Sequence, residues 1–95
     1  MDSDDFARVK PGSGQSIATG AAAVTSAAWG AQTYAVRLAC TAACHVEFGG
    51  AAATANSMLL NPSSYGEYFK VQPGATLSVI QDSAAGKLSI TEVAG

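Results

Sequence analysis

The chain has 95 residues, a formal net charge of −2 and a 48% share of hydrophobic residues, much of it alanine. This length allows one small domain, and the few large apolar side chains predict a lean core that is marginally stable without a partner. The five basic residues are scattered, which argues against direct nucleic-acid binding, because phosphate backbones require clustered Lys and Arg.

The sequence also argues against membrane insertion. The N-terminus is acidic where a signal peptide needs a basic start and an apolar run. No segment approaches the ~20 continuous apolar residues that span a bilayer. We therefore expect synthesis in a cytoplasm, where thiols normally stay reduced.

Residues 1–14 are expected to form an N-terminal arm ahead of a single β domain at 15–95. The arm is acidic, contains Pro11 and two glycines, and has little to bury beyond Phe6 and Val9. Two interpretations stay open. The arm is either a disordered terminus or a segment that lies along a neighbouring subunit, anchored by Phe6 and Val9.

Residues 15–19 are predicted to form a short first strand. The alanines of 20–29 favour a helix, but the segment has no apolar stripe and is bracketed by Gly20 and Gly30. We expect a loop, or a weak strand that ends at Trp29.

The segment 33–49 is predicted to form a β-hairpin. Apolar residues alternate on both arms, and the two sets share a face only if Cys40 opposes Cys44 around a three-residue loop. The same register places Arg37 opposite Glu47, as a cross-strand ion pair. It also places Ala39 opposite His45.

After a loop at 49–56, strands are predicted at 57–60 and 68–72. In the latter, Phe69 and Val71 are expected to point inward, and Tyr68, Lys70 and Gln72 outward. Pro73 and Gly74 indicate a tight turn.

Segments 75–81 and 87–93 are predicted to form a second hairpin. Leu77 and Val79 would share a face with Leu88 and Ile90, with Gln81 opposite a Gly86 of positive φ. Six or seven short strands separated by turns predict an all-β protein, a small antiparallel sandwich or barrel.

The sequence predicts no enzyme, cofactor or metal site. Cys44 and the single histidine, His45, are neighbours on a strand, so their side chains leave opposite faces and cannot act together. No nucleophile-elbow motif is present. Cys40, Cys44 and His45 lack the spacing of common zinc and haem sites.

A Cys40–Cys44 disulfide is possible in the predicted register but is not expected. It would close a very short loop and so add little chain-entropy stabilisation. In a reducing compartment the two residues are expected to pack as small apolar thiols. Oxidation after release from a cell stays open.

The amphipathic aromatics Trp29, Tyr65 and Tyr68 are candidates for contact with a partner, together with Phe6 and Val9. Tyr65 lies in a Ser/Gly loop, where an aromatic residue is often an interface anchor. Packing back onto the domain is an equal alternative for it.

Three segments carry a family resemblance: TYAVRLACTAACHVEFG, SMLLNPSSYGEYFKVQPG and LSVIQDSAAGKLSITEVA. Together they resemble small virion structural proteins of tailed bacteriophages and prophages, similar in size to capsid decoration (cement) proteins. The resemblance spans about 15–94 and offers no catalytic motif. Cys40 departs from it, since an apolar residue is more usual there.

The resemblance implies a decoration protein on the outer phage head, with the major capsid protein as its partner. It would be made in the host cytoplasm and reside on the capsid surface of the virion. A homo-oligomer is expected, and a trimer would suit local threefold positions. Alternatives are a tail, neck or head–tail connector component, a host-surface or glycan binding module, and a regulatory or toxin-inhibitor protein.

Overall fold

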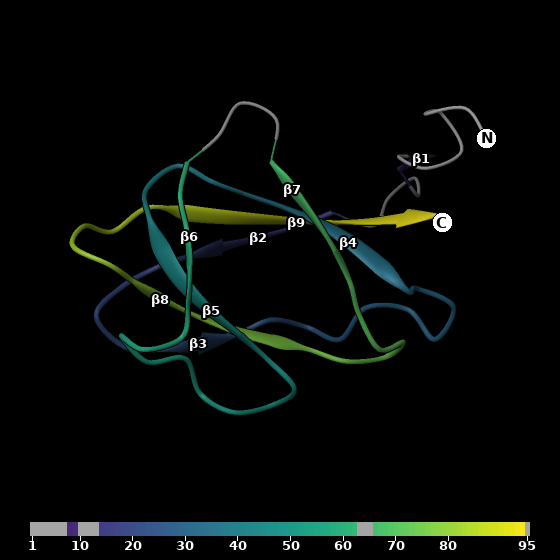
Figure 1. Ribbon diagram of the computed structural model, residues 1–95, viewed down its shortest axis with the longest axis horizontal. Coiled ribbons are helices and arrows are strands. Elements are labelled where there is room, and N and C mark those ends of the chain that lie inside the picture. Colours follow the sequence, from purple (N-terminus) through teal and green to yellow (C-terminus); the bar gives the residue numbers. More distant parts are fainter. Residues whose placement is uncertain (1–7, 10–13, 63–65, 95) are drawn as a thin grey trace.

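The computed structural model describes residues 8–9, 14–62 and 66–94, and within them every regular element is a strand. The all-β prediction is therefore confirmed. The strands form two antiparallel sheets, stacked face to face (Figure 1). They are β1 (Arg8–Val9), β2 (Gln15–Ala18), β3 (Val24–Thr25), β4 (Ala35–Cys40), β5 (Cys44–Phe48), β6 (Met58–Leu60), β7 (Glu67–Lys70), β8 (Leu77–Gln81) and β9 (Lys87–Ala94).

Sheet A has the order β2-β9-β4-β7, and β1 also pairs with β9; sheet B has the order β3-β8-β5-β6. Four of these ladders, β2·β9, β3·β8, β4·β7 and β5·β6, nest inside one another along the chain. In all four ladders the residue numbers of two paired residues add up to nearly the same total, which is the mark of one continuous antiparallel pairing. Examples are Gln15 with Ile90, Val24 with Val79, Ala35 with Lys70 and Cys44 with Leu60.

The whole domain is therefore one long antiparallel ribbon that turns between β5 and β6. The ribbon rolls up on itself, and the roll is closed by two further ladders, β4·β9 and β5·β8. Eight strands in two such sheets form a jelly roll.

Both predicted hairpins are wrong. β4 and β5 lie in different sheets, and so do β8 and β9, so each connection crosses the sandwich. Cys40 does not pair with Cys44, nor Gln81 with Gly86. The alternation identified the residues that face the core, but residues on one core can face each other across it as well as lie side by side within a sheet.

The predicted ion pair across the first hairpin is accordingly absent. Arg37 lies between Tyr68 and Thr91 in sheet A, whereas Glu47 lies opposite Ser78 in sheet B. Ala39 and His45 are likewise in different sheets, with Ala39 opposite Ser89.

Gly86 is needed for space rather than for a positive φ, which it does not have. A Cβ atom at this position would lie 2.7 Å from Thr41 Oγ1 and 2.8 Å from Ala42 Cβ. Two connections that cross from one sheet to the other, β4–β5 and β8–β9, come so close together here that there is no room for a side chain at position 86. At the Pro73–Gly74 turn the prediction is confirmed, with Gly74 at a φ of 71°.

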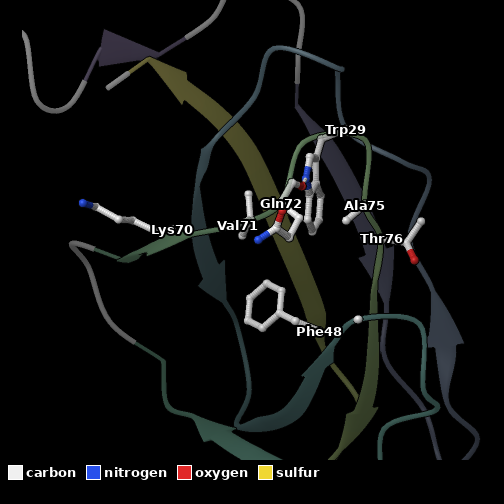
Figure 2. Close-up of a pocket in the computed structure, with 8 residues that line it drawn as sticks. Trp29, Phe48, Lys70, Val71, Gln72, Ala75 and Thr76 are labelled. Atoms are coloured by element: carbon white, nitrogen blue, oxygen red, sulfur yellow. Dashed lines mark hydrogen bonds between the residues drawn. The ribbon is translucent and has the colours of Figure 1, made fainter.

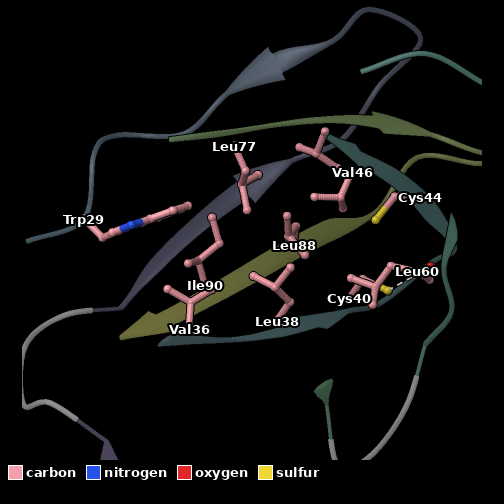
Figure 3. Close-up of a cluster of buried hydrophobic side chains, with 11 residues drawn as sticks. Trp29, Val36, Leu38, Cys40, Cys44, Val46, Leu60, Leu77, Leu88 and Ile90 are labelled. Carbon is pink, nitrogen blue, oxygen red and sulfur yellow. Dashed lines mark hydrogen bonds between the residues drawn. The ribbon is translucent and has the colours of Figure 1, made fainter. Parts of the chain in front are cut away.

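The core lies between the sheets and takes side chains from both (Figure 3). Phe69 and Val71 pack against it, as predicted, while Tyr68, Lys70 and Gln72 are exposed. Its buried members are Trp29, Val36, Leu38, Cys40, Cys44, Val46, Leu60, Leu77, Val79, Leu88 and Ile90.

The segment 20–29 forms no helix and contains only the two-residue strand β3. Trp29, at its end, closes one end of the core and is 3% exposed. Its indole Nε1 donates a hydrogen bond to the Gln72 carbonyl at 2.7 Å.

Candidate functional site

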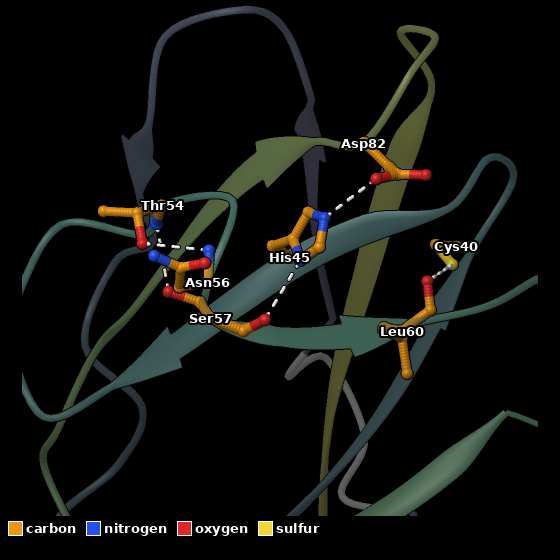
Figure 4. A network of polar contacts seen from close by, with 7 residues as sticks. All are labelled: Cys40, His45, Thr54, Asn56, Ser57, Leu60 and Asp82. Carbon is orange, nitrogen blue, oxygen red and sulfur yellow. Dashed lines mark hydrogen bonds and ion pairs between the residues drawn. The ribbon is translucent and has the colours of Figure 1, made fainter.

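The two thiols are core groups. Cys40 and Cys44 are free and buried, and Cys40 Sγ lies 3.6 Å from the Leu60 carbonyl, to which it donates (Figures 3 and 4). Burial raises the pKa of both, that of Cys44 to about 12. A thiol with such a pKa carries almost no thiolate at neutral pH and is a poor nucleophile or metal ligand.

His45 fastens two loops to the outer side of sheet B (Figure 4). Its Nδ1 lies 3.0 Å from the Ser57 carbonyl, and its Nε2 lies 2.9 Å from Asp82 Oδ1. These contacts, first the Ser57 carbonyl and then the Asp82 carboxylate, raise the pKa of His45. Both partners accept, so only the doubly protonated imidazolium can donate to both at once.

The loop 49–57 covers the two central strands, β5 and β8, on the outer side of sheet B. The backbone N–H of Ala53 donates to Ser78 Oγ at 2.9 Å, and Ser78 is 2% exposed. Ser57 Oγ donates to Glu47 Oε1 at 2.9 Å. Ser78, Glu47 and His45, which leave this side of the sheet, are therefore hydrogen-bonded within the chain, whereas Thr25 on the edge strand β3 is exposed.

The outer side of sheet A is different. We call face A the accessible side chains that leave sheet A away from the core. Because strand side chains alternate and the inward set is fixed by the buried Leu38, Leu88 and Ile90, the outward set follows from the register. It comprises Ser16, Ala18, Ala35, Arg37, Ala39, Tyr68, Lys70, Lys87, Ser89 and Thr91.

Face A carries the positively charged side chains that the structure describes. Among the residues whose side chains the structure describes, the Lys and Arg residues are Arg37, Lys70 and Lys87, and all three belong to face A. The Asp and Glu residues of the same set, Glu47, Glu67, Asp82 and Glu92, all lie outside it. A chain with a net charge of −2 thus presents one cationic side.

Around those charges face A is flat, because six of its ten members are Ala, Ser or Thr. Tyr68 is its one aromatic residue and is 40% exposed. Face A can therefore approach another protein surface closely and offers one aromatic anchor and three cations to it.

Of the five predicted contact residues, Tyr68 is at the surface. Trp29 is not available for contact, because it is buried in the core. Val9 lies on β1 opposite Val93. Phe6 and Tyr65 lie outside the described residues.

A pocket of about 370 Å³ opens at one end of the sandwich (Figure 2). Trp29 and Phe48 line it from opposite sides, with Val71 and Gln72 between them, while the Lys70 side chain extends away from the cavity. Gly49, Ala75 and Thr76 complete the lining. The Trp29 and Phe48 ring centroids are 6.3 Å apart, in an edge-to-face arrangement.

No protein-family model, curated protein or solved structure matches this chain. Within the described residues no group of three or more His, Cys, Asp or Glu side chains is placed to hold a metal ion. No helix in that part of the chain could cross a membrane.

Sequence reasoning missed face A, although a signal for it was present. Small or basic residues alternate with apolar ones in 16–18, 35–40 and 87–91, which shows that each strand has one side without large apolar side chains. The sequence did not indicate that these three strands are neighbours in one sheet, so it could not predict that these sides together form one surface.

Proposed function

We propose that this chain is a structural protein of a tailed-bacteriophage head, a decoration protein that docks on the outer capsid through face A. The observation that carries the proposal is the flat, cationic face A, which holds the three described basic side chains, whereas a loop covers the central strands of sheet B. Such a surface suits repeated docking on a large protein lattice better than capture of a small molecule.

Two further observations support the proposal. The segments that resemble small phage virion proteins form β4 to β9, which includes every strand of face A except β2. The jelly roll is also a common architecture of viral capsid domains, although it occurs in lectins too. This second support is an analogy of fold and does not specify a partner.

In this role the protein would act by binding alone. Each docked copy would add its binding free energy to the assembled shell and none to free coat subunits. The three basic side chains of face A would attract it to an acidic surface of the major capsid protein; they are Arg37, Lys70 and Lys87. A homo-oligomer, with a trimer at local threefold axes, would multiply weak single contacts.

The decisive experiment is quantitative mass spectrometry of purified filled heads. A decoration protein is expected at hundreds of copies, in fixed proportion to the coat protein. A copy number that fits a single ring would instead indicate a connector, neck or tail component. Absence from heads and tails, with a sugar-dependent thermal shift or a soluble heterodimer, would refute the virion role.

A further inference from the structure

The two buried cysteines lie together at one end of the core, although they belong to different sheets. Cys40 is the last residue of β4 in sheet A, and Cys44 is the first residue of β5 in sheet B. Only the connection 41–43 separates them along the chain. Figure 3 shows both side chains at the end of the core opposite Trp29.

Two contacts place the sulfur atoms next to each other. Cys40 Sγ donates to the Leu60 carbonyl at 3.6 Å, and Leu60 is the residue of β6 that pairs directly with Cys44. The Cys40 side chain thus reaches across the core to the backbone of sheet B. A hydrogen bond also joins the two thiols. Because the single proton of the Cys40 thiol goes to Leu60, Cys44 is the donor of this bond.

The connection 41–43 is fixed to both sheets. The Thr41 N–H donates to the Lys87 carbonyl at the start of β9, and the Asp82 N–H, just after β8, donates to the Ala43 carbonyl. In the middle of a sandwich the sheets lie about 10 Å apart, too far for a disulfide, whose Cα atoms are at most about 6.8 Å apart. The thiol pair lies instead where the chain crosses between the sheets. Rotation of two side chains can therefore join the sulfur atoms without breaking a ladder.

We propose that Cys40 and Cys44 form a disulfide between the two sheets when the folded protein meets a low-molecular-weight disulfide in an oxidising medium. In a cytoplasm rich in reduced thiols the pair stays reduced. The bond ties a central strand of face A to a central strand of sheet B. Its formation requires no capsid, so it holds or fails independently of the proposed function.

The reaction is a thiol–disulfide exchange in two steps. Cys40 is 8% exposed and Cys44 is fully buried, so the oxidant reaches Cys40 first. The Cys40 thiolate attacks one sulfur of the oxidant, whose S–S bond breaks and releases one thiolate, and a mixed disulfide forms. The Cys44 thiolate then attacks Cys40 Sγ and displaces the second thiolate. The two cysteines lose two electrons and two protons, and the oxidant takes up both as two thiols.

Burial makes this reaction slow and its product durable. Because burial raises the pKa of both thiols, attack on an oxidant requires local opening of the connection 41–43. The same burial protects the finished bond from reducing thiols. Oxidation removes the weak S–H hydrogen bond to Leu60, which is a small loss beside the constraint that the bond places on the unfolded chain.

The test uses the full chain, purified under reducing conditions and then incubated with oxidised glutathione at neutral pH. Intact-mass measurement should show a loss of about 2 Da, the two hydrogens of the thiols. After unfolding, both cysteines should have become resistant to alkylation, whereas the reduced protein should take up one label on each. The oxidised form should have a Tm higher by about 4 °C or more, and reduction should abolish this difference.

Cys40→Ala is the matched control, and its Tm should be the same with and without the oxidant. The comparison of oxidised with reduced wild type needs no variant, so it decides the matter even where Cys40→Ala does not fold. Two alkylatable thiols after prolonged incubation, a lasting glutathione adduct, a disulfide-linked dimer, or equal Tm values of the oxidised and reduced forms would each overturn the proposal.

Discussion

The two outer sides of this sandwich are built from the same kind of strand but are used differently. Over sheet B the loop 49–57 lies on the strands and consumes their polar groups, Ser78, Glu47 and His45. Over sheet A the outward side chains of face A remain accessible and carry the described lysines and arginine. The comparison teaches that the polar residues of a strand hold a covering loop in place on one side of the sandwich and contribute charge to the surface on the other.

The largest expected effect comes from reversing charge on face A. Arg37→Glu combined with Lys87→Glu should lower the affinity for purified heads by at least about 100-fold, because like charges would then face each other. Both positions lie outside the end pocket. Occupancy of heads in a co-sedimentation assay gives the result.

The matched control adds negative charge to the opposite side, with Thr25→Glu and Leu59→Glu. Both residues leave sheet B outward and are exposed. Equal loss of binding by the two variants would contradict the assignment of docking to face A. Wild-type binding should also weaken steeply with added salt.

The same serine-to-alanine change should have opposite consequences on the two sides. Ser78→Ala leaves the buried Ala53 N–H without its acceptor, which should cost about 1–3 kcal/mol. This corresponds to a fall in Tm of about 4–8 °C per kcal/mol for a domain of this size. Ser89→Ala on face A should stay within about 0.5 kcal/mol. Equal effects in thermal unfolding would argue that the loop cover contributes no stability.

Tyr68 and Leu59 compare the exposed side chains of two edge strands. Tyr68→Ala should lower head affinity by about 10-fold, as expected of an aromatic anchor. Leu59→Ala, on β6 of sheet B, should leave it unchanged. Binding titrations on filled heads measure both, and a larger effect at Leu59 would move the docking surface to sheet B.

The smallest expected effect is a pH dependence that belongs to the covered side alone. The pKa of His45 is raised in the folded state above its ordinary value of 6.5. The stability that it adds is therefore complete below pH 6.5 and is lost as the pH rises through the higher folded value. Urea unfolding at several pH values should show this decline.

Asp82→Asn should make that pH dependence weaker by removing the carboxylate that His45 contacts, while the Ser57 carbonyl, the larger cause of the raised pKa, stays in place. Glu67→Gln, at an exposed carboxylate on β7, is the control and should leave the profile in place. A wild-type stability that rises with pH across this range would contradict the assignment to His45.

The inward residues of the fold could be predicted from the sequence. Alternation in 36–40, 44–48, 69–71, 77–79 and 88–90 identified the core side of five strands, because one buried face imposes a period of two. Tyr34, which the same alternation placed on the core side, is instead 54% exposed. Strand pairing could not be predicted in this way. Cys40 and Cys44 both face the core but come from opposite sheets. A three-residue connection can join two strands of different sheets as well as two paired strands of a hairpin, so its length did not decide the pairing.

The candidate site was predictable only in part. Tyr68 was expected at the surface and is there, whereas Trp29 was expected at an interface and instead fills the end of the core. Composition cannot distinguish these two uses of an aromatic residue. The clustering of Arg37, Lys70 and Lys87 depends on three strands that are far apart in the sequence, so no local pattern reveals it.

The nested ribbon has a consequence for how the domain can be rebuilt. The last residues of β9 pair with β1, so the two ends of the described chain are already neighbours. A circular permutant that links the termini and opens the chain at Gly49–Gly50, two exposed glycines with positive φ, keeps every ladder intact. In it β1·β9 and β2·β9 become the most local pairs and β5·β6 the most distant, which reverses the order of loop closure during folding without changing the folded state.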